Sequence, residues 1–382
     1  MSENPLLRLE RLGQSVWLDD LRRNFIESGE LKRLIDEDGL AGVTSNPSIF
    51  NKAIGGSHDY DEAIRTLVAQ GKNREEIYEV LAVQDVQQVA DLLRPKYDRS
   101  GGPGGFVSLE VNPHLAYKTD QTITEARHLW SAVHRPNAFI KVPATRAGLP
   151  AIRQLISEGI NVNVTLLFGL PRYEEVVEAY IRGLEDRAAK GGSLQRISSV
   201  ASFFLSRIDV LVDPMLEKMR QGGGDKAALA QKLQGQVALA SAKKAHDIYK
   251  KLFQGDRFRR LADRGATPQW LLWASTGTKN PAYSDVKYVE PLIGPETINT
   301  MPLETLQAYR DHGQPEVRLE EGLAEALQVL ANLAEAGIDI DKVTQQLEEE
   351  GVQKFNEPFD SLLETLARKR GELLREPPDP RK

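Results

Sequence analysis

Eight short apolar runs, rich in β-branched and aromatic residues, alternate along the chain with longer stretches of helical periodicity. Alternation sustained over most of a chain is typical of parallel α/β architecture, because parallel neighbours need a crossover connection. Eight strands predict a closed (β/α)8 TIM barrel with additional helices, and a doubly wound open sheet is the alternative. The last expected strand carries the weakest signal. The expected strands occupy residues 15–20, 39–47, 104–112, 137–144, 159–168, 195–204, 269–276 and 296–302.

The chain length leaves room for more than the barrel. A barrel of this kind takes roughly 250 residues, and the chain has 382. We find no repeat and no linker, so a single catalytic domain is expected over 1–382. A charged helical segment is expected at about 320–375, followed by a frayed tail at 376–382. The helix-rich stretches 50–95 and 215–265 are expected to shield the barrel mouth and pad its sides.

Composition and charge exclude several classes of function. The net charge is -6, and the basic residues are spread along the chain, which gives no basis for binding nucleic acid or a membrane surface. There is no cysteine, so disulfides and thiolate metal sites cannot form. No apolar run approaches the ~20 residues of a membrane span, and the first residues lack a signal-peptide core. We therefore expect a cytoplasmic protein, either a monomer or a homodimer, that acts on small molecules.

Polar side chains stand near the end of nearly every expected strand. The carboxyl ends of barrel strands meet on one face, where the active sites of such enzymes form. Each residue alone has a simpler explanation, such as a helix cap or a turn before proline. Together they predict a ring of polar groups around one barrel mouth. They are Asp19 or Asp20, Thr44, Asn46, Glu110, Asn112, Lys141, Asn163, Thr165, Ser202 and Ser275.

A lone lysine, Lys141, interrupts the apolar run "NAFIKVPAT". By itself it is equally consistent with a lysine whose ammonium group reaches the surface. A lysine held inward among apolar walls loses hydration, which favours the neutral amine, and such an amine attacks carbonyl carbons to form a Schiff base. Asp19 and Glu110 are the carboxylates available to move protons. Hydroxyl and amide groups at the other strand ends suit a polyhydroxylated substrate, so the set predicts carbonyl chemistry on a sugar without a metal.

Two cations are candidates for binding a phosphate group. Arg207 follows the expected strand 195–204, and Lys279 lies in the loop "STGTKNP". The alternatives are a surface pair between Arg207 and Asp209, and a solvated loop lysine. Other chemistries lack their motifs: there is no dinucleotide fingerprint, phosphate loop or G-x-S-x-G elbow, and no His-x-x-x-His pair.

Six motifs taken together resemble the transaldolase family, most closely its longer bacterial type. The resemblance extends over about residues 13–375 and implies a (β/α) barrel with a Schiff-base lysine and no cofactor. It implies transfer of a dihydroxyacetone unit, in the pentose phosphate pathway, from sedoheptulose 7-phosphate or fructose 6-phosphate to glyceraldehyde 3-phosphate or erythrose 4-phosphate. The motifs are "GVTSNPSIF", "SLEVNP", "FIKVPAT", "GINVNVTLLF", "SVASFFLSRID" and "WASTGTKNP".

The resemblance also implies a role for each matching residue. Lys141 matches the Schiff-base lysine, and Asp19, rather than Asp20, matches the acid/base that takes the C4 hydroxyl proton. Glu110 and Thr165 match the pair that holds a catalytic water and moves protons as the carbinolamine forms and breaks down. Substrate hydroxyl and phosphate contacts are implied for Thr44, Asn46, Asn163, Ser202, Arg207, Ser275 and Lys279.

One position departs from the pattern, and two other functions remain open. Gly277 stands where a well-known form of the family has a second phosphate-binding arginine, so Lys279 is the nearest substitute, and a lysine is a point charge rather than a bidentate fork. The first alternative function is a related sugar-phosphate aldolase that releases free dihydroxyacetone; it is typically shorter and has a tyrosine where this chain has Glu110. The second is a barrel that binds sugar phosphates without catalysis.

Overall fold

The computed structural model describes residues 4–375, and its eight parallel strands close into a barrel in the order β1 to β8. Strand β8 pairs with β1 over five residues, which confirms the predicted (β/α)8 barrel and rules out the open sheet. The tail expected at 376–382 lies outside the described residues. The strands are β1 (Gln14–Leu18), β2 (Gly42–Val43), β3 (Phe106–Glu110), β4 (Ala138–Pro143), β5 (Val162–Leu167), β6 (Ser199–Phe204), β7 (Trp270–Ala274) and β8 (Thr297–Met301).

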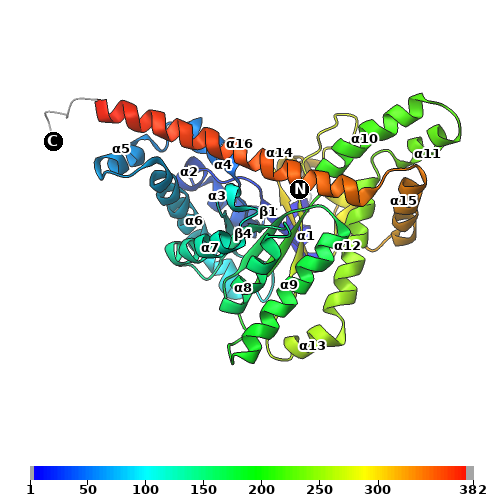
Figure 1. Ribbon diagram of the computed structural model, residues 1–382, viewed down its shortest axis with the longest axis horizontal. Helices are drawn as coiled ribbons and strands as arrows, with labels where there is room; N and C mark the ends of the chain where they lie inside the picture. The colour runs from blue at the N-terminus through cyan, green and yellow to red at the C-terminus, as the bar shows by residue number, and fades with distance from the viewer. Residues whose placement is uncertain (1–3, 376–382) are drawn as a thin grey trace.

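Helices surround the barrel and connect successive strands, except between β7 and β8, where a long loop carries only the 3-10 helix η2 (Figure 1). The helices beyond one for each connection between strands are the additional helices that the sequence predicted. The helices are α1 (Pro5–Arg11), α2 (Arg23–Glu27), α3 (Glu30–Glu37), α4 (Pro47–Gly55), α5 (Asp61–Ala69), α6 (Arg74–Arg99), η1 (Pro113–Leu115), α7 (Thr119–Val133), α8 (Gly148–Glu158), α9 (Leu170–Ala189), α10 (Ser206–Gln221), α11 (Asp225–Leu233), α12 (Val237–Phe253), α13 (Asp256–Ala262), η2 (Glu290–Leu292), α14 (Leu303–His312), α15 (Leu323–Glu335) and α16 (Ile340–Arg375).

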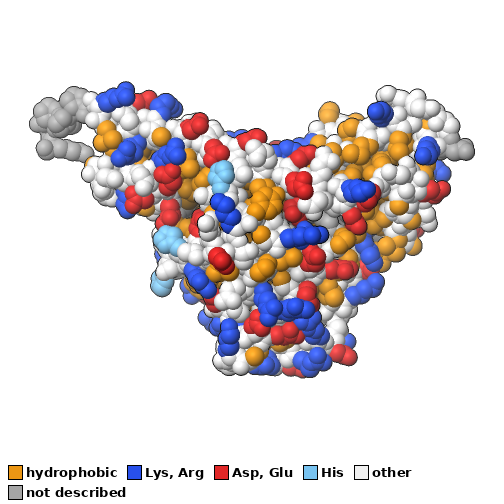
Figure 2. Space-filling view, in the orientation of Figure 1, with side chains coloured by type: hydrophobic (Ala, Val, Ile, Leu, Met, Phe, Trp, Pro, Cys, Tyr) orange, Lys and Arg blue, Asp and Glu red, His pale blue; other side chains and the backbone are white. Residues whose placement is uncertain are grey.

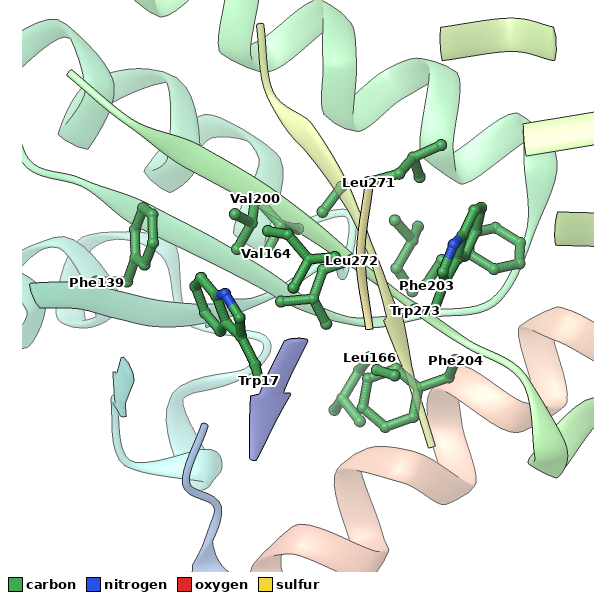
Figure 3. Close-up of a cluster of buried hydrophobic side chains, with 14 of the residues drawn as sticks. Trp17, Phe139, Val164, Leu166, Val200, Phe203, Phe204, Leu271, Leu272 and Trp273 are labelled. Carbon is green, nitrogen blue, oxygen red and sulfur yellow. The ribbon is translucent and has the colours of Figure 1, made fainter. Parts of the chain in front are cut away.

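Large aromatic side chains fill the inner end of the barrel. Trp17, Phe106 and Phe139 are fully buried and stack on one another, with 4.5 Å between the ring centroids of the two phenylalanines. Figure 3 shows Trp17 and Phe139 side by side. Gly42 makes room for the indole, because a Cβ atom there would lie 2.3 Å from the Trp17 ring. The inner end is therefore a packed core, as in other barrels of this type.

On β6 and β7, aromatic side chains point outward and pack under the helices. Phe203 and Trp273 are paired across β6 and β7, and their rings meet edge to face with centroids 6.5 Å apart. In Figure 3 both lie away from Trp17, on the side of the surrounding helices. Because parallel strands are buried on both faces, a charged residue within them needs a partner or a function.

The last described helix, α16, runs across the carboxyl ends of the strands, which we call the barrel mouth (Figure 1). Gly351 allows a close approach, since a Cβ atom there would lie 3.1 Å from Cδ2 of Leu166, at the end of β5. Toward the other end of the helix, the ammonium group of Lys369 lies 2.6 Å from the carboxylate of Asp61. Helix α16 thus covers the mouth from one side of the barrel to the other.

The helix that covers the mouth is not one of those expected to do so. Of the stretch 50–95, Lys52 borders a cavity near the mouth, and no residue of 215–265 lines that cavity or the one beside Lys141. The alternation of apolar and charged residues in α16 predicts a helix that packs on something. It does not say on what, because the partner lies elsewhere in the sequence.

None of the helices formed by residues 4–375 is long and apolar enough to cross a membrane. On the face drawn in Figure 2, basic and acidic side chains are interspersed rather than gathered by sign. Mixed charge of this kind is typical of a solvated surface.

Candidate active site

A cavity of about 170 Å³, here called the inner cavity, lies at the barrel mouth. It brings together side chains that are scattered over the sequence and that the strand-end pattern singled out. Of the other predicted residues, Glu110, Asn163 and Thr165 belong to β3 and β5, beside the strand of Lys141. Asn112 does not line the cavity; its side chain caps η1 by accepting a hydrogen bond from the backbone N–H of His114. The predicted site residues that line the inner cavity are Asp19, Thr44, Asn46, Lys141, Ser202, Arg207, Ser275 and Lys279.

Lys141 lies inside the barrel and does not reach the surface. Only 4% of the residue is exposed, and its Nζ donates to the backbone carbonyl of Ser45 at 3.1 Å. Nζ also lies 3.4 Å from Oε2 of Glu110, which is opposite Lys141 in the β3–β4 register. Strand β4 is buried along its whole length, so the Lys141 side chain cannot extend from it to the surface. Lys141 is thus held in the wall of the inner cavity.

Two polar atoms on β3 and β5, the strands that flank β4, are buried without a partner. Oε1 of Glu110 and Oγ1 of Thr165 have no hydrogen bond to any residue of the described chain. Burial raises the pKa of Glu110 to about 7, and the Lys141 ammonium opposes this shift. A carboxyl group with such a pKa can accept and release a proton near neutral pH. Buried polar atoms without partners are costly, and they mark places where a structure serves chemistry rather than stability.

Asp19 occupies the opposite wall of the inner cavity. Oγ1 of Thr44 donates to Oδ1 of Asp19 at 2.7 Å, and the same hydroxyl lies 2.8 Å from Oγ1 of Thr300 on β8. Burial raises the pKa of Asp19, with Lys141 and the Thr44 hydrogen bond opposing the shift. The neighbouring Asp20 does not line this cavity.

Asp20 pairs instead with Arg22, at 2.7 Å, and lines a second cavity of about 510 Å³. We call this the outer cavity. It shares six lining residues with the inner cavity and is also lined by residues of α4 and α14, among them Lys52 and Glu304. Asp19 thus lines both cavities, whereas Asp20 lines only the outer one.

Asn163 and Ser202 form a network across β3, β5 and β6. Oγ of Ser202 donates to Oδ1 of Asn163 at 2.7 Å, and Nδ2 of Asn163 donates to Oγ of Ser108 at 3.0 Å. Asn163 is fully buried and does not line the inner cavity, whereas Ser202 does. The Asn163 amide therefore fixes the orientation of the Ser202 hydroxyl.

Arg207 lies in the first turn of α10, with its guanidinium beside the inner cavity. Its Cζ is 5.5 Å from the centre of the Phe204 ring and 5.9 Å from that of Phe355, and Nη1 is buried with no partner in the described chain. Burial lowers the pKa of Arg207, and Asp19 opposes the shift.

The alternative reading of Arg207, a surface pair with Asp209, is wrong. Asp209 is buried, and its carboxylate accepts hydrogen bonds from Lys287 and Tyr288, each at 2.8 Å. These contacts tie α10 to the loop after β7. The charge of Arg207 therefore remains available to a ligand in the cavity.

The loop after β7 supplies the remaining groups. Ser275 adopts the left-handed conformation, with φ of 55°, and its hydroxyl lies 2.9 Å from that of Ser206. A Cβ atom on Gly277 would lie 3.0 Å from Cγ of Pro302 and 3.7 Å from Nζ of Lys279. The ammonium group of Lys279 thus lies close to the position where a side chain at 277 would begin.

Some lining residues were not found from the sequence. Thr300 lies one residue before the end of β8, so the rule that found the other polar residues near strand ends applies to it as well. Phe204 and Phe355 are apolar, and nothing in their sequence surroundings distinguishes them from core residues. The Ser45 carbonyl belongs to the backbone and leaves no signal in the sequence.

The fold and this arrangement define a class of protein: a (β/α)8-barrel enzyme whose mouth brings together a buried lysine, carboxyl groups, hydroxyl groups and two further cations. Such a set is suited to carbonyl chemistry on a phosphorylated sugar. Comparison with known proteins identifies the family. The family model described as Transaldolase/Fructose-6-phosphate aldolase matches residues 16–366, and the chain belongs to this family.

Proteins named Transaldolase resemble the chain over almost its full length. The one from Trichodesmium erythraeum is 48% identical over 373 residues, which cover 97% of this chain and 98% of the relative. The one from Thiobacillus denitrificans is 49% identical over 355 residues, covering 93% and 97%. The one from Saccharopolyspora erythraea is 46% identical over 366 residues, covering 96% and 97%. The predicted family and the enzyme class, a transferase of the transaldolase type, are confirmed.

Proposed function

We propose that this chain is a transaldolase that transfers a dihydroxyacetone unit through a Schiff base on Lys141. The donor is a ketose phosphate, sedoheptulose 7-phosphate or fructose 6-phosphate, and the acceptor is glyceraldehyde 3-phosphate or erythrose 4-phosphate. The observation that carries the proposal is the buried Nζ of Lys141, 3.4 Å from Glu110 at the floor of a cavity lined by hydroxyl groups and cations. We further propose that the chain forms one catalytic domain, since the first and last strands pair and α16 packs back over the mouth. We also propose that this domain acts in the cytoplasm.

Formation of the Schiff base is assigned to Lys141, Glu110 and Thr165. The neutral amine of Lys141 attacks the C2 carbonyl of the donor and gives a carbinolamine, which loses water to become the iminium. Glu110 supplies and takes up the protons for these steps, a role supported by its pKa of about 7. The unpartnered oxygens of Glu110 and Thr165 fit a water molecule that is released here and consumed when the product is hydrolysed.

Cleavage and transfer are assigned to Asp19. Its carboxylate takes the proton of the C4 hydroxyl, the C3–C4 bond breaks, and its electron pair enters the iminium to give an enamine. The first aldose phosphate leaves as an aldehyde. The enamine carbon then attacks the aldehyde carbon of the acceptor, and Asp19 returns its proton to the new alkoxide. Burial raises the pKa of Asp19, which makes its carboxylate a better base than an exposed aspartate.

The phosphate end of the sugar is assigned to Arg207, Lys279 and Ser275, all of which line the inner cavity. Arg207 offers donors without a partner in the described chain, and Lys279 adds a second positive charge near Gly277. Thr44, Asn46 and Ser202 are assigned to the substrate hydroxyl groups, with Asn163 acting through its hydrogen bond to Ser202.

The main alternative is release of free dihydroxyacetone, since the matching family model covers fructose-6-phosphate aldolases as well. Transfer is favoured because the similarity to proteins named Transaldolase extends over almost the whole of both chains. A barrel that only binds sugar phosphates is disfavoured, because binding alone gives no reason to bury Lys141 beside Glu110.

The first experiment is borohydride trapping with fructose 6-phosphate, followed by mass spectrometry of the digested chain. We expect an adduct of dihydroxyacetone mass on Lys141. Addition of erythrose 4-phosphate before the borohydride should discharge the adduct and yield sedoheptulose 7-phosphate. Free dihydroxyacetone in place of the transfer product would favour the aldolase, and absence of an adduct on any lysine of the folded protein would contradict the mechanism.

A further inference from the structure

Helix α16 places one side chain, Phe355, in the wall of the inner cavity. The residue is 4% exposed, although it lies on a helix outside the barrel. Its ring centre is 5.6 Å from Nζ of Lys141 and 5.9 Å from Cζ of Arg207. The ring also lines the outer cavity, so it stands at the boundary between the two spaces. Phe355 is thus the one aromatic residue of the described chain whose ring centre lies within 6 Å of both Nζ of Lys141 and Cζ of Arg207.

The guanidinium of Arg207 has aromatic neighbours where most buried arginines have carboxylates. Among residues 4–375, no hydrogen bond or ion pair is formed by this guanidinium, and its Nη1 is buried. Two rings lie within the roughly 6 Å over which a cation interacts with an aromatic face, one from Phe204 and one from Phe355. The planar guanidinium stacks on such faces, so the rings can fix its direction without using its donors.

Contacts on the preceding turns of α16 hold Phe355 in place. Two turns earlier, Glu348 pairs with Arg172 at 3.1 Å, and both side chains are at most 10% exposed. One turn earlier, Gly351 lets the helix backbone approach Leu166 of β5. Figure 3 shows Leu166 and Phe204 next to each other at the helix that crosses this side of the barrel. The position of the Phe355 ring is therefore fixed by the barrel itself.

We propose that Phe355 is a positioning residue for Arg207. Its ring, together with that of Phe204, directs the guanidinium into the cavity, so that the phosphate end of the sugar is bound at a fixed distance from Lys141. The inference rests on the proposed function, because it assigns phosphate binding to Arg207. It makes α16 part of the substrate site, with the donors of Arg207 left free for the phosphate oxygens.

The test compares Phe355→Leu with the matched control Phe359→Ala. Phe359 lies one turn further along α16, is 5% exposed and packs edge to face with Tyr78 at 5.3 Å, but it lines neither cavity. In Phe355→Leu we expect the KM for fructose 6-phosphate and the inhibition constant of inorganic phosphate each to rise about ten-fold, with kcat within about two-fold. Trapping of unphosphorylated dihydroxyacetone on Lys141 should keep the wild-type rate. Phe359→Ala should leave the two phosphate-dependent constants unchanged.

Three results would overturn the inference. Equal losses in dihydroxyacetone trapping and in phosphate binding would show that the ring serves Lys141 or the fold. The same rise in KM in Phe359→Ala would show a general effect of α16. Unchanged constants in Phe355→Leu would show that Phe204 alone is sufficient. Each of these assumes that the wild-type protein is trapped on Lys141; if the wild type gives no adduct, the proposed function fails, and not only the role of Phe355.

Discussion

The inner end and the mouth of this barrel are built from the same strands and differ in nearly every physical respect. Trp17 and Phe139 pack ring against ring at the inner end, and two residues further along the same strands stand Asp19 and Lys141. The aromatic layer is stabilised by its own packing and does not need a ligand. The charged layer keeps groups whose hydrogen-bonding capacity the chain does not use. A step of two residues along a strand thus separates what stabilises the fold from what performs the chemistry.

The electrostatics of the two layers differ in the same way. At the mouth, burial raises the pKa of Asp19 and of Glu110, because the charged form of each carboxyl group loses hydration there. At the inner end no charge is buried among the three stacked rings. The comparison predicts that substitutions at the mouth change catalysis with little effect on stability, and that substitutions at the inner end do the reverse.

The largest effect is expected for Lys141→Met, which removes the amine and keeps an apolar side chain of similar length. Turnover should fall at least ~10⁴-fold, because no other group lies in place to form the Schiff base. The melting temperature should remain within a few degrees of wild type, since Glu110 can stay protonated in its buried position. Steady-state kinetics and thermal unfolding check both expectations. Turnover above a hundredth of wild type would contradict the assigned role.

The next effect concerns the inner end. Trp17→Ala should lower the free energy of unfolding by about 3–5 kcal/mol, because it opens a cavity beside Phe106 and Phe139. Urea denaturation measures the loss, and kcat per folded molecule should change little. Tyr117→Ala, at a side chain that is 56% exposed, is the control and should leave stability nearly unaltered. A Trp17→Ala variant that remains stable but loses kcat would contradict the prediction that the inner end serves stability and the mouth serves catalysis.

Glu110→Gln should slow the formation and hydrolysis of the Schiff base about 10²-fold, because the amide cannot move protons between the carbinolamine and water. The rate of borohydride trapping after rapid mixing with fructose 6-phosphate measures formation of the imine. The C3–C4 cleavage step, assigned to Asp19, should be affected less. Equal slowing of both steps would mean that Glu110 acts on the site as a whole.

The pKa of Glu110 also predicts how stability depends on pH. The folded protein holds this proton to about pH 7, whereas an ordinary glutamate releases it near 4.5, so the folded state binds more protons between these values. Stability contributed by this group is therefore present below about pH 4.5 and is lost as pH rises through about 7. Urea denaturation of the wild type and of Glu110→Gln across this window should show a decline present in the wild type only. A parallel pH dependence in the two proteins would contradict the raised pKa.

The smallest effect is expected at the phosphate end. Lys279→Ala should raise the KM for fructose 6-phosphate about five- to ten-fold, because one positive charge near Gly277 is lost while Arg207 remains. Lys52→Ala is the matched control, since Lys52 lines the outer cavity and not the inner one. An equal rise in KM in both variants would show that Lys279 acts only through the general positive potential of the mouth.

Much of the fold and of the site could be predicted from the sequence, because the necessary signals are local. Strand period, helix period and the polar residue at a strand end are all read within a few positions, which is how Lys141, Glu110 and Ser202 were found. Phe355 could not be found in this way, because the pattern of a helix tells which face is buried and not what it is buried against. The partner of Asp209 was missed for a similar reason, since Lys287 lies in the loop after β7, on the far side of three helices and a strand.

The position of α16 in the chain has a consequence for biosynthesis. The barrel strands end at Met301, and the ring that reaches Arg207 comes only at Phe355. A nascent chain on the ribosome can therefore pair all eight strands while its mouth is still uncovered and Lys141 lacks its aromatic neighbour. Such an intermediate would hold Lys141 in a mouth that is open on the side of α16, and the wall of the inner cavity is completed only when this helix has been translated and has docked.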